Sequence, residues 1–427
     1  MNDLLTGMLQ QLDEPAARLD MLDRYYLGQQ PLAFLAPEAR DALGDRLTTL
    51  SINIPRLLVD SIAERLRVVG FDRDDVWPAW IAADLDQLAP LAHREALTMG
   101  TSYAVVWAHP DGSPNVSIES PRQVTVLRDP STRRIVAAVK RWRTDTTTEA
   151  VLYEGDRITR FTADSVGAST VGFRSTEVLD NPLGVVPVVE FRNATRLLQA
   201  GRSEMADVLS LSDALTKLTA DMLVASEYTA RPRRWATGLE LEEDDDGNEV
   251  SPISEGDRMM INQEPDGKFG QLPGSDLAGY ETAIGTIMRQ ISAVSGLPEH
   301  MLGIGGDNPT SADSIRASEA ALTARAEARQ HSFGRSWEQV ARLMIAVAGG
   351  LDPHAVDVRV KWANPATRSM AQEADAVTKL YTAGLLPAST ALARLGYTAD
   401  EVEEIRAVRR AESLDSAGVD VLRGLAS

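Results

Sequence analysis

The chain has 427 residues, of which 44% are hydrophobic, and its 62 Asp and Glu against 43 Lys and Arg give a formal net charge of −19 at pH 7. That length exceeds one compact core and predicts two to four lobes. The acidic balance does not suit a protein that grips DNA by neutralising phosphates, and the absence of cysteine excludes disulfides, thiol nucleophiles and cysteine-ligated zinc.

No segment has the composition of a signal peptide or of a membrane-spanning helix. Residues 1–14 lack a basic start and an apolar core and include Asp13 and Glu14, which is not the pattern of a secretory signal. The longest nearly apolar stretch, Leu343–Leu351, is too short to cross a bilayer. We therefore expect a chain that is made in a reducing cytoplasm and does not insert into a membrane.

Residues 1–100 are predicted to be helical, and strands follow them. Apolar residues recur at helical spacing after Pro55, and Gly100 is a C-terminal stop signal. Ser102–Ala108 is β-branched and aromatic, and His109–Ser113 has the composition of a hairpin turn. Pro187, between two pairs of valines, predicts an edge strand or an extended segment. The remaining strands are expected at meander spacing, at Val116–Glu119, Gln123–Leu127, Arg134–Arg143, Ala150–Tyr153 and Arg157–Phe161.

Two predicted helices with heptad-spaced apolar residues enclose an insertion. The helices cover residues 203–229 and 276–296, and the insertion, 230–275, is rich in Gly, Pro and acidic residues. The seam residues are Leu211, Leu215, Leu218, Met222 and Ala225 in the first helix and Leu277, Tyr280, Ile284, Ile287, Ile291 and Val294 in the second. A seam of this period needs another helix to cover it. The pattern predicts a stalk with a small separate tip, an arrangement more typical of assembly than of catalysis.

A loop and a long helix are predicted after the stalk. The loop, residues 297–310, is rich in glycine and longer than most connections between helices, which favours a functional loop over a plain connector. Thr310 and Asp313 predict a capping-box start for one long helix over residues 311–349. A strand-like stretch, Val356–Trp362, follows, and the C-terminal region is predicted to be helical with breaks at residues 384–387 and at Gly396.

No catalytic or cofactor-binding signature is present. The sequence has no Walker A, HExxH or GxSxG pattern, and its glycine-rich loop lacks the spacing and the preceding strand of a dinucleotide site. The five histidines lie on separate predicted elements without the spacing of metal ligands. With 62 acidic residues, no carboxylate pair stands out. The sequence therefore predicts no enzyme activity, no metal and no cofactor.

Charged residues gather in the predicted tip. An acidic run comprises Glu240, Glu242, Glu243, Asp244, Asp245 and Asp246. It is either a solvated hairpin turn or a docking surface for basic partner proteins. Arginines precede it together with a tryptophan, as Arg231, Arg233, Arg234 and Trp235. They either touch a nucleic-acid backbone or pair with the acidic residues of a neighbouring subunit.

The order helix, insertion, helix, loop and long helix resembles the portal proteins of tailed bacteriophages, and it is most similar to those of long-tailed siphophages that infect actinobacteria. The matching stretches are Ile291–Gly303 (ISAVSGLPEHMLG), Asn308–Ala320 (NPTSADSIRASEA), Tyr25–Gly28 (YYLG), Asn53–Pro55 (NIP) and Gly70–Phe71 (GF). The similarity covers most of the chain. It is a family pattern and not a catalytic signature.

The resemblance implies an α+β, portal-type multidomain subunit. In this scheme residues 1–202 form a wing of helices and a β-meander, with 350–369 as a further wing strand. Residues 203–229 and 276–296 are the two stem helices, and 230–275 a small α/β clip. Residues 297–310 are a tunnel loop, 311–349 a long spine helix, and 370–427 a short helical crown.

The resemblance also implies how such a subunit acts. Copies would form a dodecameric ring at one capsid vertex, as part of a virion assembled in the bacterial host cytoplasm. Double-stranded DNA would pass through the channel without sequence specificity. The expected protein partners are the terminase large subunit, head-completion or adaptor proteins, and the major capsid and scaffolding proteins.

Three groups of residues are candidates for these contacts. The candidates for DNA contact in the tunnel loop are Gly303, Gly305, Gly306, Asp307 and Asn308. The candidates for DNA or intersubunit contact in the stem are Lys217 and Arg289. The candidates for partner docking are the clip residues Arg231, Arg233, Arg234, Trp235, Glu242, Glu243, Asp244, Asp245 and Asp246. The main alternative is a non-viral cytoplasmic oligomeric scaffold without a DNA role, and a metal-dependent nuclease is a more distant one.

Overall fold

The structure, a computed structural model, describes residues 3–31, 52–230, 234–237, 242–243, 249–250, 266–271, 277–304, 311–366, 370–398 and 400–412. The chain divides into two compact units. The first comprises Met1–Gln30, Ser51–Ser212 and Arg289–Ser427, and the second Pro31–Leu50 and Asp213–Met288.

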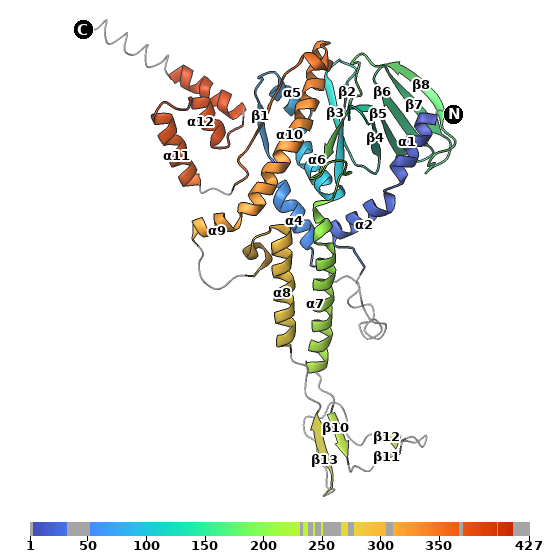
Figure 1. Ribbon diagram of the computed structural model, residues 1–427, viewed down its shortest axis with the longest axis vertical. Coiled ribbons are helices and arrows are strands. Elements are labelled where there is room, and N and C mark those ends of the chain that lie inside the picture. Colours follow the sequence, from blue (N-terminus) through green and yellow to red (C-terminus); the bar gives the residue numbers. More distant parts are fainter. Residues whose placement is uncertain are drawn as a thin grey trace, which may run out of the picture. The chain divides into compact units, whose positions relative to one another are not determined.

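A five-stranded antiparallel meander is the largest sheet of the first unit (Figure 1). Its strands, in spatial order, are β4 (Val124–Arg128), β5 (Ile135–Arg143), β6 (Thr148–Glu154), β7 (Arg157–Ala163) and β8 (Arg174–Asp180). Helix α1 (Asp3–Asp13) packs on one face, where Leu5 and Leu9 meet Val139 and Leu152. The meander prediction is thereby confirmed for four strands, whereas β8 was not predicted, because its sequence RSTEVLD is mostly polar.

A second, three-stranded antiparallel sheet has the order β3 (Pro114–Glu119), β2 (Thr101–Ala108), β9 (Val188–Arg192). The hairpin at residues 109–113 joins β2 to β3, as predicted. Strand β9 lies at the edge of the sheet, which confirms the edge strand expected near Pro187. Apolar residues of this sheet, including Tyr103 and Val188, pack against Val124 and Ala138 of the five-stranded sheet.

The longest described helix of the first unit, α10 (Ala320–Gly349), packs against β2, β9 and α4. Helices earlier in the chain are α2 (Ala16–Leu27), α4 (Ile54–Ala63), α5 (Val76–Ala82) and α6 (Leu85–Met99). The prediction that residues 1–100 are helical throughout is wrong at β1 (Val68–Phe71), which pairs with the distant β14 (Val360–Trp362). Strand β14 lies within the stretch predicted to be strand-like, Val356–Trp362.

Aromatic side chains fill the core beneath α10. Trp337 is fully buried, with ring centroids 4.5 Å from Phe191 and 4.8 Å from Trp80. His93 on α6 stacks on Phe333, and its Nε2 accepts a 2.7 Å hydrogen bond from the indole N–H of Trp337. Because Nε2 accepts, the buried imidazole is neutral and carries its proton on Nδ1.

This buried histidine predicts a dependence of stability on pH. Burial lowers the pKa of His93 to about 3 from its ordinary 6.5. Between these values the unfolded chain binds a proton that the folded chain excludes, so stability falls by about 1.4 kcal/mol for each pH unit below 6.5. Gln in place of His93 keeps an acceptor without this titration. We expect the stability difference between the wild type and His93→Gln, measured by urea unfolding, to narrow as pH falls from 6.5 to 4. Parallel curves would show that His93 does not titrate in the unfolded chain as argued.

Two glycines from distant segments meet backbone to backbone. Gly100 ends α6 with φ +96°, and a Cβ built on it would lie 2.6 Å from the carbonyl carbon of Gly201. A Cβ on Gly201 would lie 2.2 Å from the carbonyl oxygen of Gly100. The backbone N–H of Asn193 also donates to the carbonyl oxygen of Gly100, at 2.9 Å. This crossing fixes the path of the chain from β9 towards the first stem helix.

Two of the predicted helix boundaries need correction. The first stem helix, expected over 203–229, is a 3-10 turn η2 (Glu204–Asp207) followed by α7 (Leu209–Ala230), because the Ser203 hydroxyl caps the turn by accepting from the N–H of Met205. The single spine helix expected over 311–349 is two helices, α9 (Ala312–Ser318) and α10, with a break at Glu319. At the break the Ser318 hydroxyl donates to the carbonyl of Ile315 at 2.6 Å, competing with the helical backbone.

The N-terminal cap of α9 also differs from the prediction. Ser311 is the capping residue, and its side chain accepts from the N–H of Ser314. Thr310, the predicted cap, lies outside the described residues. Further along, α11 (Met370–Thr382), α12 (Ala388–Arg394) and a helix over residues 400–412 confirm the helical C-terminal region. The predicted breaks are confirmed as well, since Gly384 and Gly396 both have positive φ.

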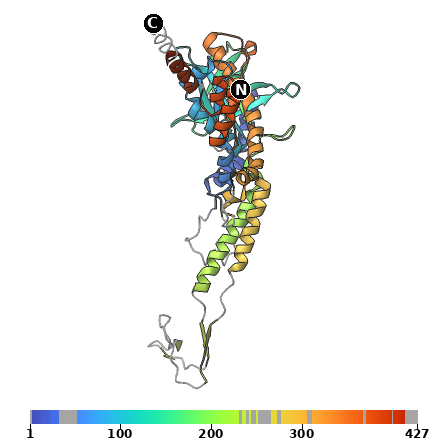
Figure 2. The same ribbon diagram turned by 90° about the vertical axis from the view of Figure 1, so that its left-hand side faces the viewer.

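The second unit contains most of α7, the beginning of α8 (Ala278–Ser295) and short strands. Figures 1 and 2 both show the two helices side by side, and α8 lies within two residues of its predicted bounds. Strand β10 (Arg234–Thr237) pairs with β13 (Lys268–Gln271), and β11 (Glu242–Glu243) with β12 (Glu249–Val250). The described residues of the predicted clip are thus mainly strands, and a helix within the clip stays a prediction.

Candidate functional site

The apolar seams of α7 and α8 are only partly covered. Leu215 and Ile291 are buried, but the other described seam residues are half-buried, and Val294 is 41% exposed. Helices of 22 and 18 residues, about 33 and 27 Å long, therefore present incompletely covered apolar stripes. An apolar stripe at heptad spacing is a surface for helix packing.

The two basic stem candidates occupy different surroundings. Lys217 forms an ion pair with Asp221, one turn further along α7. Its charge is therefore already balanced within the helix. Arg289 is exposed on α8, and it interacts with other residues of the chain. Charge on the stem is sparse: α7 has three acidic residues and one lysine, and α8 has one glutamate and one arginine.

A buried carboxylate stands at the start of the first stem helix. Glu204 of η2 is 9% exposed and accepts from Arg329 at 2.8 Å, Asn193 at 3.1 Å and Arg325 at 3.3 Å. Burial acts to raise the pKa of Glu204, but the charge and hydrogen bond of Arg329, with help from Asn193 and Arg325, outweigh it and lower the pKa below its ordinary value. Glu204 is therefore ionised at neutral pH, and α10 supplies both of its arginines.

Arg325 also reaches the end of the second stem helix. Its second terminal nitrogen donates to the carbonyl of Val294 in the last turn of α8, at 2.7 Å. Gly296, just after that turn, lies so close that a Cβ on it would be 3.3 Å from the Arg325 Nε. One side chain of α10 thus contacts the segment that leads into the stem and the segment that returns from it.

A second buried carboxylate lies at the break between α9 and α10. Glu319 is 4% exposed, and its oxygens lie 3.1 Å from the Arg65 Nη2 and 3.6 Å from the His300 Nε2. Arg65 follows α4, and His300 belongs to a 3-10 turn, η3 (Glu299–Leu302). Glu319 therefore ties the break between α9 and α10 both to the residue that follows α4 and to the turn within the predicted tunnel loop.

The tunnel-loop candidates are only partly described. Gly303 follows η3 with φ +72°, the left-handed conformation that glycine adopts without strain. Gly305, Gly306, Asp307 and Asn308 lie outside the described residues. A cavity of about 500 Å³ lies between the end of α8, η3 and α9, and Ile304 and Ile315 are among its lining residues. The DNA contact expected of this loop stays a prediction.

The clip candidates are divided in the same way. Trp235 of β10 lies opposite Gly270 of β13, and its ring occupies the place of a side chain there, because a Cβ on Gly270 would be 2.5 Å from it. Trp235 as a whole remains 45% exposed. Glu242 and Glu243 form β11, and Arg234 begins β10. Arg231, Arg233, Asp244, Asp245 and Asp246, with Glu240 of the acidic run, lie outside the described residues. Docking by these residues stays a prediction.

Neither of these two buried carboxylates was predictable from the sequence. Glu204 and Arg329, like Arg65 and Glu319, are far apart along the chain, and a single glutamate in an acidic chain carries no signal of burial. The nearest available hint was the arginine spacing of the spine helix, in which Arg325 and Arg329 are one turn apart and lie on the same face.

The described residues contain neither a metal-binding group nor a membrane-spanning helix. No group of three or more His, Asp or Glu side chains there is arranged to hold a metal ion. None of the described helices is long and apolar enough to span a membrane.

Comparisons with known proteins agree with one another. The family model for "Phage portal protein, SPP1 Gp6-like" matches residues 8–414. The portal protein of Mycobacterium phage L5 is 32% identical over 388 residues, which cover 83% of this chain and 78% of that protein. The portal protein of Mycobacterium phage D29 has the same identity and coverage.

The solved structures to which the chain shows some similarity include those of gene transfer agent particles. The neck of the empty particle, computed with C6 symmetry, has a TM-score of 0.49 and 16% identity, and the match covers 89% of this chain and 93% of that one. The neck of the native particle, computed with C12 symmetry, has a TM-score of 0.48 and 15% identity with the same coverage. On the extent of the family match and the identity to the two mycobacteriophage proteins, this chain belongs to the family of phage portal proteins.

Proposed function

We propose that copies of this chain form a ring at one vertex of a phage capsid, and that double-stranded DNA enters and leaves through the central channel. As a member of the portal-protein family the chain is a structural component of the capsid and not an enzyme. Family membership favours this role over a non-viral scaffold, and it removes the reason to consider a nuclease.

The main observation in favour of a ring is that the heptad-spaced apolar residues of the two stem helices are incompletely buried within one chain. Half-buried residues such as Leu218, Met222, Ile284 and Ile287 lie on α7 and α8. Burying apolar surface is worth about 25 cal/mol per Å², so each stem gains stability from neighbouring stems. Side-by-side repetition of one subunit through a heterologous interface forms a ring when the rotation between neighbours closes. We take the subunit number to be twelve.

The charge of the stem suits a channel that DNA slides through. With four acidic and two basic residues, α7 and α8 offer few cations for phosphate contact, and Lys217 is paired within its helix. Many phosphate contacts would hold DNA in place, because each contributes to binding. Contacts made by backbone and small residues of the tunnel loop, from Gly303 to Asn308, would carry no sequence information.

The regions of the chain take the following proposed roles. Residues 1–202 and 350–369 are the wing, 203–229 and 276–296 the stem, 230–275 the clip, 297–310 the tunnel loop, 311–349 the spine and 370–427 the crown. The acidic clip residues dock the terminase large subunit during packaging and head-completion or adaptor proteins afterwards. The wing contacts the major capsid and scaffolding proteins, and assembly takes place in the host cytoplasm.

Native mass spectrometry with negative-stain imaging tests the ring. We expect a particle near twelve times 46.3 kDa with an open axial channel, and loss of that particle for Met222→Glu, which places a charge in the stem seam. Ser226→Glu, an exposed position on the same helix, should still assemble. A closed dimer or tetramer without a channel would contradict the proposal.

Charge reversal in the clip tests docking in the same rings. The double substitution Glu242→Lys with Glu243→Lys should weaken binding of the terminase large subunit without affecting assembly.

A further inference from the structure

Two leucines between β9 and η2 are the most exposed large apolar side chains among the described residues. Leu197 is 82% and Leu198 90% exposed. Leu198 also has φ +60°, a left-handed backbone conformation that residues with a side chain rarely adopt. Exposed apolar residues on strained backbone often mark contact sites. We call residues 194–200 the leucine loop.

The leucine loop has fixed ends. The N–H of Arg202 donates to the carbonyl of Asn193, and the side-chain amide of Asn193 donates to the carbonyl of Arg202, both at 2.8 Å. Asn193 is 3% exposed and also bonds to Glu204. The loop is therefore closed at its base by a buried residue of the Glu204 cluster, so its two leucines are presented from a defined position in the first unit.

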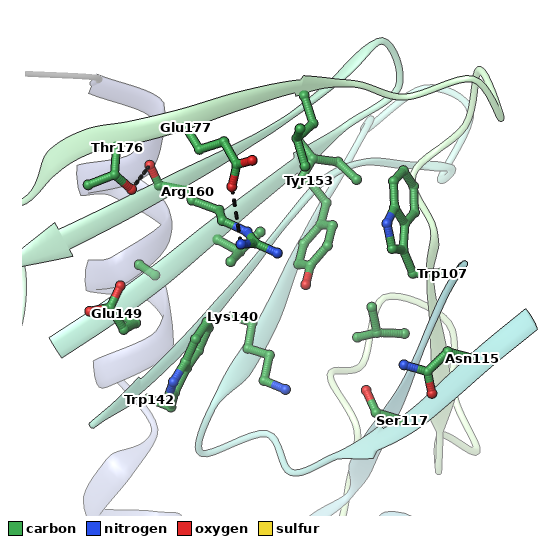
Figure 3. Close-up of a pocket in the computed structure, with 15 residues that line it drawn as sticks. Trp107, Asn115, Ser117, Lys140, Trp142, Glu149, Tyr153, Arg160, Thr176 and Glu177 are labelled. Carbon is green, nitrogen blue, oxygen red and sulfur yellow. Dashed lines mark hydrogen bonds and ion pairs between the residues drawn. The ribbon is translucent and has the colours of Figure 1, made fainter. Parts of the chain in front are cut away.

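An apolar groove lies elsewhere in the same unit. One face of the five-stranded sheet is covered by α1, and the other is covered only in part, by the packing of β2 and β9 near β4 and β5. Beyond this packing a cavity of about 720 Å³ remains open (Figure 3). We call it the wing groove, and its apolar lining includes Trp107, Trp142, Tyr153, Ile158 and Leu179.

The charged groups of the wing groove are mostly paired. Lys140 pairs with Glu119, and Arg160 with Glu177 at 3.1 Å. Glu149 instead accepts from the hydroxyls of Thr162 at 2.6 Å and Thr147 at 2.7 Å, and these hydrogen bonds, with a smaller contribution from the charge of Arg174, lower its pKa. Arg174 itself forms its ion pair with Asp164. The groove therefore offers aromatic and aliphatic surface with one ionised carboxylate that forms no ion pair within the described residues. Its chemistry fits an apolar segment that carries one positive charge.

The leucine loop is such a segment. Arg196 directly precedes the two leucines and has no ion pair with any described residue. We propose that the leucine loop of one copy inserts Leu197 and Leu198 into the wing groove of the next copy, with Arg196 against Glu149. This inference rests on the proposed ring. A heterologous ring interface joins two different patches of the same chain, and here both patches and the opposite charges are present.

The local charge of the groove favours this pairing as well. Residues 121–180, which contain the five-stranded sheet, have ten Lys and Arg against eight Asp and Glu, whereas the whole chain has a net charge of −19. Like charges repel when acidic surfaces meet. The five-stranded sheet is therefore a region against which another copy of this acidic chain can lie without that repulsion.

The absence of cysteine from the chain makes a direct test possible. Rings would be assembled from an equal mixture of Leu198→Cys protein and protein carrying cysteine at either Asn115 or Thr176, on opposite sides of the groove (Figure 3). After mild oxidation we expect a disulfide-linked dimer that contains one chain of each kind. The matched control pairs the same groove cysteines with Leu385→Cys, because Leu385 lies between α11 and α12 and is 70% exposed. This control should give no disulfide-linked dimer.

Charge exchange tests the polar contact. Arg196→Glu and Glu149→Arg should each weaken assembly about two- to fivefold, as expected for an exposed ion pair, and the double variant should restore it. Leu197→Asp with Leu198→Asp should weaken assembly more than about tenfold. Intact rings of the mixed cysteine variants that give no cross-link at either groove position, together with charge variants that do not compensate, would overturn this contact while leaving the proposed ring intact. Failure of the wild type to form any ring would instead count against the proposed function.

Discussion

Replacing Trp337 by alanine is expected to lower the free energy of unfolding of the first unit by about 3–5 kcal/mol, the usual range for deleting a large buried aromatic side chain. Trp337 is fully buried between Trp80, Phe191 and His93, and it donates the hydrogen bond to the His93 Nε2. The substitution therefore leaves a cavity and an unpaired buried acceptor. Urea unfolding followed by tryptophan fluorescence would measure the loss.

Two comparisons separate these contributions. Trp337→Phe keeps most of the apolar contact but removes the donor, so its cost should be smaller, about 1–3 kcal/mol for an unpaired buried group. Trp142→Ala, at a half-buried position of the wing groove, should cost less than Trp337→Ala. Equal losses for Trp142→Ala and Trp337→Ala would contradict the placement of the core beneath α10.

Glu204→Ala is expected to destabilise the first unit by about 3–5 kcal/mol, because it leaves a buried arginine without its counter-charge. Only 10% of the Arg329 side chain is exposed, and Arg329 donates to Glu204 at 2.8 Å. Since the pKa of Glu204 is lowered in the folded chain, its contribution is present above the unfolded value of about 4.3 and is lost as pH falls below it. Thermal or urea unfolding at pH 7 and at pH 4 measures both effects.

The matched substitutions for Glu204 distinguish charge from packing. Glu204→Gln keeps the hydrogen-bonding shape and should be less damaging than alanine. Arg329→Met removes the buried charge from the other side, and combined with Glu204→Leu it should recover much of the loss, because an apolar pair of similar volume often replaces a buried ion pair without cost. Additive losses in that double variant would show that the two side chains do not act as a pair.

Periodic parts of the fold were predictable from the sequence. The heptad spacing of Tyr280, Ile284 and Ile287 located α8 to within two residues. The alternation and turn chemistry of residues 102–161 predicted the first strands of both sheets. Such patterns are visible in one sequence because they repeat over many residues and reflect which face is covered.

Features that depend on contacts between distant residues were not predictable. The break at Glu319 interrupts an alanine-rich stretch that favours a continuous helix, and it arises where that carboxylate meets Arg65 and His300. Strand β1 is only four residues long and exists through its pairing with β14. The Glu204 cluster joins three segments, and nothing in the local sequence of any one of them indicates the others.

The crossing of Gly100 and Gly201 limits how the chain can evolve. Neither position tolerates a Cβ, because each glycine occupies the space that the other's side chain would need. Replacing one of them does not make the other replaceable, because the backbone at the first position still occupies the space that a side chain at the second would need. Neither glycine can therefore be replaced first in the course of evolution. A chain of this fold that lacks one of these glycines must have rerouted its backbone between the wing and the stem.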